Sequence, residues 1–270
     1  MTNAFERHGL DHLSASQINL YANEPALWCM EKLLGHKGHA GAAAIRGMAI
    51  EEGVLHGLLH TNDVDACIAL AEQSFDHQLG IRPAHDREKQ RDAIAGCVTQ
   101  ALEALKDVGE PTFSGDGQQR IEVQLEGVSV PFIGYLDFVY PNERLVVDLK
   151  TTLRLPSALS ASHHRQGALY ALARSDDRVE FLYATPKKHA FLPITDVDFV
   201  IAEITAIAQS MERFLSLSND AQDLTRSLAP NFESFYWSDE TMKTHARRVW
   251  DIGGQSAEGS DAPEPSQISW

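Results

Sequence analysis

Three ionisable residues occur within two very apolar segments: Asp137 in GYLDFVY, and Asp148 and Lys150 in VVDLKTT. Burying a charge is costly unless a partner compensates for it. Residues two apart on a strand share a face, so Asp148 and Lys150 point the same way if this segment is a strand. The intervening residues 141–144, PNER, are typical of a turn, and antiparallel pairing about it brings position 137 near position 148. We therefore expect two carboxylates and one ammonium to meet at one place.

This combination of side chains indicates a site for a divalent cation. Two carboxylates so close together repel each other unless a cation or a proton lies between them. Oxygen ligands at this density suit Mg²⁺ or Mn²⁺, which also accept phosphate oxygens. Lys150 can orient or deprotonate an attacking water and offset negative charge in a transition state. The alternative is an ion pair between Lys150 and Asp148 or Asp137, and the spacing alone leaves both interpretations open.

A predicted helix over residues 43–60 places a third acid in an unusual position. At 100° per residue its apolar side chains form one broad arc, and Glu51 lies near the middle of that arc. A glutamate inside a buried stripe needs a partner. A metal shared with Asp137 and Asp148 would supply one, and a salt bridge to Arg46 or another basic residue is the alternative.

A second predicted helix, over residues 157–174, adds polar groups that could face the same site. Gln166 and Tyr170 are four residues apart and therefore share a helix face. We expect Gln166 to hold a metal-bound water or a phosphate, with Tyr170 packed beside it.

Three further residues are candidates for contacts with the backbone of a nucleic acid. His164 and Arg165 lie near the start of the helix that carries Gln166, and Thr151 ends the predicted strand. For the histidine, a solvated position at the helix start is the stronger alternative.

A pattern of helices and strands must hold these residues. The apolar periodicity predicts helices at 14–34, 43–60, 63–79 and 86–108, with Pro25 starting a second helix inside the first range. It then predicts strands at 120–127, 130–140 and 144–151, a helix at 157–174, a hairpin at 181–194, and helices at 197–217 and 238–251. This order predicts an α/β fold with a central mixed β-sheet flanked by helices, rather than a regular βαβ alternation.

We expect one domain over residues 1–252. It comprises a helical N-terminal part at about 12–110, a sheet core at about 118–195 and C-terminal helices at about 197–251. Residues 253–270 are rich in Gly, Ser, Pro and acids and are predicted to be a disordered acidic tail.

The composition excludes several classes of protein. The 270 residues carry a net charge of −15, which argues against general affinity for nucleic acid but leaves room for a local basic groove. The three cysteines form no C-x-x-C pair, so neither a zinc ribbon nor a disulfide framework is expected. No apolar run approaches the roughly 20 residues that span a bilayer. We expect a cytoplasmic protein, in a bacterial cell or a phage-infected host, with no membrane partner.

Five segments resemble the PD-(D/E)XK nuclease superfamily, specifically its RecB-like and phage-exonuclease branch, over residues 12–195. The segments occur in the family's order and are LSASQINLYANEPALW, RGMAIEEGV, GYLDFVY, VVDLKTT and QGALY. The resemblance implies a restriction-endonuclease-like core that hydrolyses phosphodiester bonds of DNA. It favours an exonuclease in recombination, repair or phage DNA metabolism. A structure-specific endonuclease, an RNA nuclease and an inactive scaffold that keeps the fold are the alternatives.

The resemblance also implies roles for individual residues. Asp137, Asp148 and the backbone carbonyl of Leu149 would ligate Mg²⁺ or Mn²⁺, Glu51 would complete the shell, and Lys150 would activate the attacking water. Gln166 and Tyr170 correspond to the family's Gln-x-x-x-Tyr helix motif.

One departure from the branch concerns a second cofactor. Relatives with an iron–sulfur cluster have a cysteine before the N-terminal proline, where this chain has Glu24, and no late cysteine triplet is present. No iron–sulfur cluster is therefore expected. The partners expected are DNA, as linear ends or single strands, a single-strand annealing or binding protein, and further copies of the chain in a homo-oligomer.

Overall fold

The computed structural model describes residues 2–60, 63–82, 84, 86–114 and 117–252. The tail predicted to be disordered lies outside these residues. The helices are α1 (Ala4–Arg7), α2 (Ala15–Asn23), α3 (Pro25–Lys32), α4 (Ala42–His60), α5 (Val64–Leu79), α6 (Arg87–Leu105), α7 (Ala161–Ala173), α8 (Val197–Leu215), α9 (Ala221–Arg226), a 3₁₀ helix (Phe235–Trp237) and α10 (Glu240–Val249). The strands are β1 (Gln119–Val123), β2 (Phe132–Leu136), β3 (Phe138–Tyr140), β4 (Leu145–Thr151), β5 (Arg178–Ala184) and β6 (His189–Pro193).

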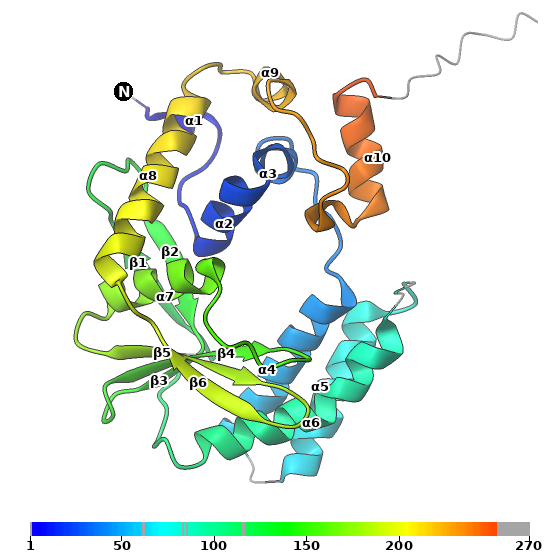
Figure 1. Cartoon of the computed structure of the whole chain (residues 1–270), viewed down its shortest axis with the longest axis vertical. Helices are drawn as coiled ribbons and strands as arrows, with labels where there is room; N and C mark the ends of the chain where they lie inside the picture. Colours follow the sequence, from blue (N-terminus) through cyan, green and yellow to red (C-terminus); the bar gives the residue numbers. More distant parts are fainter. Residues whose placement is uncertain (1, 61–62, 83, 85, 115–116, 253–270) are drawn as a thin grey trace, which may run out of the picture.

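The central sheet is mixed, as the order of elements predicts. Its four strands run in the order β3-β4-β5-β6, with β4 and β5 parallel and the two outer pairs antiparallel. Strands β1 and β2 form a separate antiparallel pair. Helices cover this sheet on both faces (Figure 1), so the predicted α/β fold is confirmed.

The prediction of one continuous strand over residues 130–140 is wrong. The chain bends at Asp137, so that β2 belongs to the two-stranded pair and β3 to the central sheet. The β3–β4 ladder ends where Phe138 pairs with Val147. The backbone N–H of Leu149 donates instead to the Asp137 side chain. The Asp137 side chain thus accepts a backbone hydrogen bond where the β3–β4 ladder ends, and the chain passes from one sheet to the other at this residue.

Alternation along β4 decides which side chains reach which layer. Leu145, Val147 and Leu149 pack with residues of α4, α5 and α6, whereas Val146 packs with Tyr170 of α7. Successive residues of a strand point to opposite faces. Asp148 and Lys150 therefore lie on the face that α7 covers.

The N-terminal and C-terminal helices form the remaining layers. Helices α1, α2 and α8 share a core with α7 and the β1–β2 pair, while α3, the 3₁₀ helix and α10 form a smaller core around Trp237. Ser14 caps α2, and Pro25 opens α3 as predicted. The indole of Trp237 donates to Glu24 at 3.2 Å, which ties the α2–α3 junction to the C-terminal part. Short elements, namely α1, α9 and the 3₁₀ helix, had no periodic signal in the sequence.

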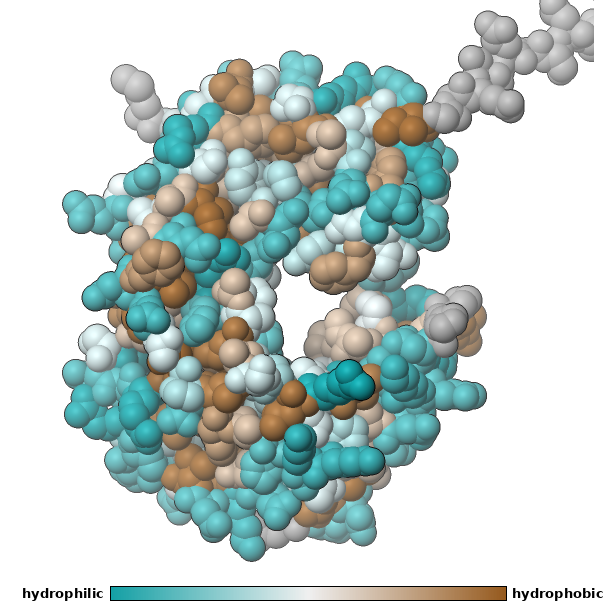
Figure 2. Space-filling model, in the orientation of Figure 1, coloured by the Kyte–Doolittle hydropathy of each residue, from teal (hydrophilic) through white to brown (hydrophobic). Residues whose placement is uncertain are grey.

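Two further properties of the described part of the chain concern its surface and its helices. In Figure 2 the molecule has an opening between its upper part, where α2 and α3 lie, and its lower part, where α4 and the central sheet lie. None of the described helices is both long enough and apolar enough to cross a membrane.

The packing of α6 on the β5–β6 turn gives a stability prediction. A Cβ at Gly96 would lie 2.4 Å from the carbonyl oxygen of Pro186 and 2.7 Å from its Cα, both backbone atoms. The clash in Gly96→Ala should outweigh the roughly 1 kcal/mol that alanine gains in a helix and lower the free energy of unfolding by about 1 kcal/mol or more. Urea denaturation measures this. Gly41→Ala, whose Cβ meets nothing within 4 Å, is the control, and an unchanged Gly96→Ala variant would contradict the packing.

Candidate active site

A cleft of about 1040 Å³ lies between α2, α7 and the β1–β2 pair, and five of the predicted site residues, but not the completely buried Asp148, line it. Glu51, Asp137, Lys150, Gln166 and Tyr170 are all in its wall. The opposite wall comes from the start of α2 and from α3 and the 3₁₀ helix, and includes Ser14, Ser16, Asn19, Lys32 and Tyr236. Residues more than 100 positions apart in the chain therefore face one another across a single cleft.

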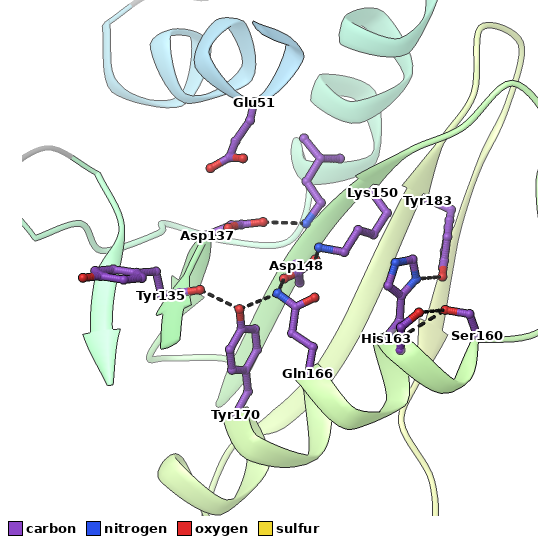
Figure 3. A network of polar contacts seen from close by, with 12 residues as sticks. Glu51, Tyr135, Asp137, Asp148, Lys150, Ser160, His163, Gln166, Tyr170 and Tyr183 are labelled. Carbon is purple, nitrogen blue, oxygen red and sulfur yellow. Dashed lines mark hydrogen bonds and ion pairs between the residues drawn. The ribbon is translucent and has the colours of Figure 1, made fainter. Parts of the chain in front are cut away.

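Asp137 is fixed by the bend at which it lies. One of its oxygens, Oδ2, accepts a hydrogen bond from the backbone N–H of Leu149 at 2.9 Å. Only 8% of the residue is exposed. Figure 3 shows its carboxylate beside β4, on the side from which Glu51 approaches.

Asp148 lies at the centre of a chain of polar contacts (Figure 3). Its side chain is completely buried, Oδ1 accepts a hydrogen bond from Gln166 Nε2 at 2.9 Å, and Oδ2 forms an ion pair with Lys150 Nζ. Gln166 also donates to the Tyr170 hydroxyl at 2.6 Å, and that hydroxyl donates to the carbonyl oxygen of Tyr135 at 2.7 Å. The Gln-x-x-x-Tyr pair of α7 thus connects Asp148 to strand β2.

Glu51 reaches the site from α4, and a residue that sequence reasoning missed connects it there. The amide nitrogen of Gln118 donates to Glu51 Oε1 at 2.7 Å and to Asp137 Oδ1 at 3.0 Å. Gln118 immediately precedes β1 and belongs to none of the motifs quoted above. The sequence carries no signal that would have singled it out, because its role depends on the meeting of three distant segments.

Burial and mutual repulsion raise the pKa values of the three acids. The pKa of Asp137 is raised well above its ordinary value by burial and by the charges of Asp148 and Glu51. The pKa values of Asp148 and Glu51 are also raised, in both cases chiefly by burial. At Lys150, burial favours the neutral amine, but the attraction of the acids outweighs it and raises the pKa. The site therefore holds more buried negative charge than its one ammonium offsets.

His163 lies on the side of Lys150 that faces away from Asp148 (Figure 3). Its ring stacks on Phe181 with centroids 5.5 Å apart, and Nδ1 is hydrogen-bonded to the Tyr183 hydroxyl. Burial and the neighbouring Lys150 charge lower the pKa of His163 to about 4. His163 is therefore neutral near pH 7 and adds no positive charge to the cleft.

The residues predicted to contact nucleic acid lie in different surroundings. Arg165 is nine-tenths buried; its guanidinium forms an ion pair with Glu203 at 2.7 Å and donates to Asn19 at 3.1 Å. It therefore connects α7 with α8 and α2, and its charge is directed into the protein. His164 and Thr151 are half-buried.

The alternative partner proposed for Glu51 is engaged elsewhere. The guanidinium of Arg46 donates to Gln90 and to the carbonyl oxygen of Thr151, the latter at 3.0 Å. The polar contact recorded for Glu51 is with Gln118 rather than with Arg46.

The carboxylate oxygens of Glu51, Asp137 and Asp148 are ligands of the kind that a divalent metal prefers, although the three acids do not form a compact cluster. Within the described residues, no three His, Cys, Asp or Glu side chains lie close enough together to hold a metal ion. The Gln118 amide lies between Glu51 and Asp137, and the Lys150 ammonium lies against Asp148. Asp148 Oδ2 is buried and its partner is the Lys150 ammonium, so this oxygen is satisfied by a positive charge rather than by a neutral donor.

Fold and site together define a class. A mixed sheet that brings an aspartate at a strand bend beside an Asp-x-Lys strand is the arrangement of a restriction-endonuclease-like fold. The family model for the PD-(D/E)XK nuclease superfamily matches residues 12–246, and the chain belongs to that superfamily. Its members are nucleases that generally use divalent metals.

Two further comparisons add little to this assignment. No curated protein matches the chain. Among the solved structures that match, the crystal structure of SSO0001 has a TM-score of 0.33 and 16% sequence identity, and the match covers 68% of this chain and 84% of that chain.

The raised pKa of Asp137 predicts how stability depends on pH. Folding takes up a proton between the unfolded pKa of an aspartate, about 3.9, and the higher folded value. The free energy of unfolding that this group contributes therefore falls as pH rises through that window. Asp137→Asn removes the ionised form, so the variant should be more stable than the wild type at pH 8 in EDTA, with the gain shrinking toward pH 4.

Urea unfolding at several pH values checks this expectation. Asp11→Asn is the matched control, because a hydrogen bond and the charge of His12 lower the pKa of Asp11, and no gain at pH 8 is expected. An Asp137→Asn gain that is equal at pH 4 and pH 8 would show that the charge of Asp137 is not the source.

Proposed function

We propose that this chain is a divalent-metal-dependent deoxyribonuclease that hydrolyses phosphodiester bonds in the cleft beside β4. The observation that supports it most strongly is that Asp137 and Lys150 line that cleft, with Asp148 buried against Lys150 and the buried negative charge only partly compensated. A buried excess of carboxylate costs stability. Its retention is explained by a function that needs the acids ionised around a cation.

The residues that would hold Mg²⁺ or Mn²⁺ are Asp137, Asp148 and Glu51, together with the backbone carbonyl of Leu149. When bound, such an ion polarises a phosphate oxygen and lowers the pKa of a coordinated water. The donors are hard oxygens, which these ions prefer. The hydrogen bonds from Leu149 N–H and Gln166 hold Asp137 and Asp148 in orientation.

Lys150 serves as a fixed positive charge in this proposal. Its pKa is raised by the neighbouring acids, so it carries its proton near neutral pH. A protonated amine orients a water and offsets charge on the scissile phosphate, and it does not accept a proton. We therefore infer that Lys150 positions the attacking water and offsets negative charge on the phosphate.

Several features of the cleft support a nucleic-acid strand as its occupant. The wall opposite the acids presents hydroxyl, amide and ammonium groups, including those of Ser16, Asn19 and Lys32. Tyr135 also lines the cleft and is 51% exposed. Polar groups suit a phosphate backbone, and an exposed aromatic ring suits an unpaired base. Arg165 has no part in this proposal, because its charge is paired inside the protein.

The resemblance to RecB-like and phage exonucleases favours digestion from DNA ends, in recombination, repair or phage DNA metabolism. Such enzymes act beside proteins that bind or anneal single strands, and some enclose DNA as oligomers. These expectations stay part of the proposal. A comparison of linear with circular DNA substrates distinguishes an exonuclease from an endonuclease.

The catalytic assignment predicts a large effect of Lys150. End-labelled linear and circular DNA, single- and double-stranded, would be incubated with Mg²⁺, Mn²⁺ or EDTA. We expect metal-dependent loss of linear DNA, with a roughly 100-fold or greater decrease in rate for Lys150→Met and for Asp148→Asn. Lys187→Met, at an exposed lysine beyond the end of β5, is the control and should keep its activity.

Three outcomes of this assay would argue against the proposal. Intact DNA under every metal condition would favour an inactive scaffold with the same fold. Equal activity of Lys150→Met and Lys187→Met would remove the lysine from the mechanism. Digestion of RNA but not of DNA would change the substrate class.

Tyr135 predicts a preference for unpaired strands. Base–aromatic stacking contributes about 1–3 kcal/mol per base, so Tyr135→Ala should weaken binding of a single-stranded oligonucleotide by roughly tenfold and binding of blunt duplex much less. Fluorescence anisotropy in EDTA measures both affinities without cleavage. Phe199→Ala is the control, because Phe199 is also an exposed aromatic residue but lies on α8 and does not line the cleft. Equal losses for single strand and duplex would contradict stacking by Tyr135.

A further inference from the structure

We propose that the side-chain amide of Gln118 competes with the divalent cation for one position between Glu51 and Asp137, and thereby sets the metal affinity of the site. The inference rests on the proposed function, since it concerns the cation that function requires. It assigns a positioning role to a residue outside the five motifs.

The geometry is the first support. A single nitrogen atom, Gln118 Nε2, lies 2.7 Å from Glu51 Oε1 and 3.0 Å from Asp137 Oδ1. An amide with two N–H groups satisfies two carboxylate oxygens at once. A cation held through these same two oxygens would need the space that the amide nitrogen occupies. The amide and a cation held in this way would therefore exclude each other.

Bond lengths make this exclusion stricter. Mg²⁺ binds oxygen at about 2.0–2.1 Å, which is much shorter than the two N–H···O distances of Gln118. An ion held through these oxygens would therefore lie closer to each of them than the amide nitrogen does. The amide holds them at hydrogen-bond spacing, in agreement with the lack of a compact three-acid cluster among the described residues.

The charge of the site decides whether the Gln118 amide or the divalent ion binds the two carboxylates more strongly. An amide carries no net charge, so it satisfies the two oxygens without offsetting the repulsion between the Glu51 and Asp137 carboxylates. A divalent ion offsets that repulsion directly. Gln118 is thus a weaker partner that the ion must displace, and the lost hydrogen bonds reduce the observed affinity.

The backbone next to Gln118 fixes where its side chain starts. Gly117 has φ +123°, a conformation that side-chain-bearing residues rarely adopt, and a Cβ there would lie 2.6 Å from Leu55 Cδ2 of α4. This close approach holds residue 118 beside the helix that carries Glu51. The ladder of β1 begins only at Gln119, and the side chain of Gln118 lines the cleft, which gives it room to turn aside.

The opposite role for Gln118 makes the opposite prediction. If its hydrogen bond served to orient Glu51 toward the metal, its loss would weaken metal binding, as removal of outer-shell partners does. If it had only a structural role, its loss would change stability and leave metal affinity unaltered. Direct measurement of binding separates these roles without reference to activity.

The test is Mn²⁺ binding to the full chain in the absence of DNA, by isothermal titration calorimetry and by electron paramagnetic resonance of free Mn²⁺. Gln118→Met keeps most of the side-chain volume but donates no hydrogen bond. We expect its Kd for Mn²⁺ to be about tenfold lower than that of the wild type, and Mn²⁺ to raise its Tm by more. Gln118→Ala should shift the Kd in the same direction and serves if the methionine variant folds poorly.

Gln119→Ala is the matched control, because the neighbouring Gln119 donates to Thr112 and contacts neither acid. Its Kd should equal that of the wild type. An unchanged or higher Kd in both Gln118 variants would overturn the inference while leaving the proposed function standing, provided that Asp148→Asn abolishes Mn²⁺ binding. Lack of Mn²⁺ binding by the wild type and by both Gln118 variants would overturn the inference and the metal-dependent function together.

Discussion

Repulsion among buried carboxylates is the constraint on which the rest of this structure depends. Asp137, Asp148 and Glu51 come from a strand bend, a central strand and a helix, and burial raises the pKa of each. The surrounding hydrogen bonds all act on this excess of negative charge: Leu149 and Gln118 donate to Asp137, and Gln166 donates to Asp148. Lys150 supplies the ammonium that is paired with Asp148. Such a site stabilises the fold poorly by itself, and the cation that we propose for it would account for its arrangement.

Two local features of the fold position the residues of this site. The bend at Asp137 transfers the chain from the β1–β2 pair to the central sheet and, in the same step, turns a carboxylate toward β4. Alternation along β4 then directs Asp148 and Lys150 toward α7, where Gln166 is in reach. The opposite face of the same strand carries Leu145, Val147 and Leu149 into the main apolar core. Core packing therefore fixes the direction in which the charged residues point.

The sequence predicts those parts of the structure that depend on local pattern. The turn at 141–144, the antiparallel register that brings residue 137 near 148, and the mixed sheet are confirmed. The break in strand 130–140 escaped prediction, because it depends on a side chain bonding to a distant N–H. Arg165 was expected to face a nucleic acid, but Glu203 on a later helix pairs with it. Gln118 was missed for the same reason, since its partners lie 67 and 19 residues away.

The central claim is that these acids share a divalent ion. The most direct measurement is anomalous diffraction from crystals of the protein soaked in Mn²⁺. We expect an anomalous peak between the carboxylates of Asp137 and Asp148, within ligand distance of Glu51, with the Gln118 amide turned away from them. A peak only at other surface acids, with the Gln118 amide still donating to Glu51 and Asp137, would contradict the account.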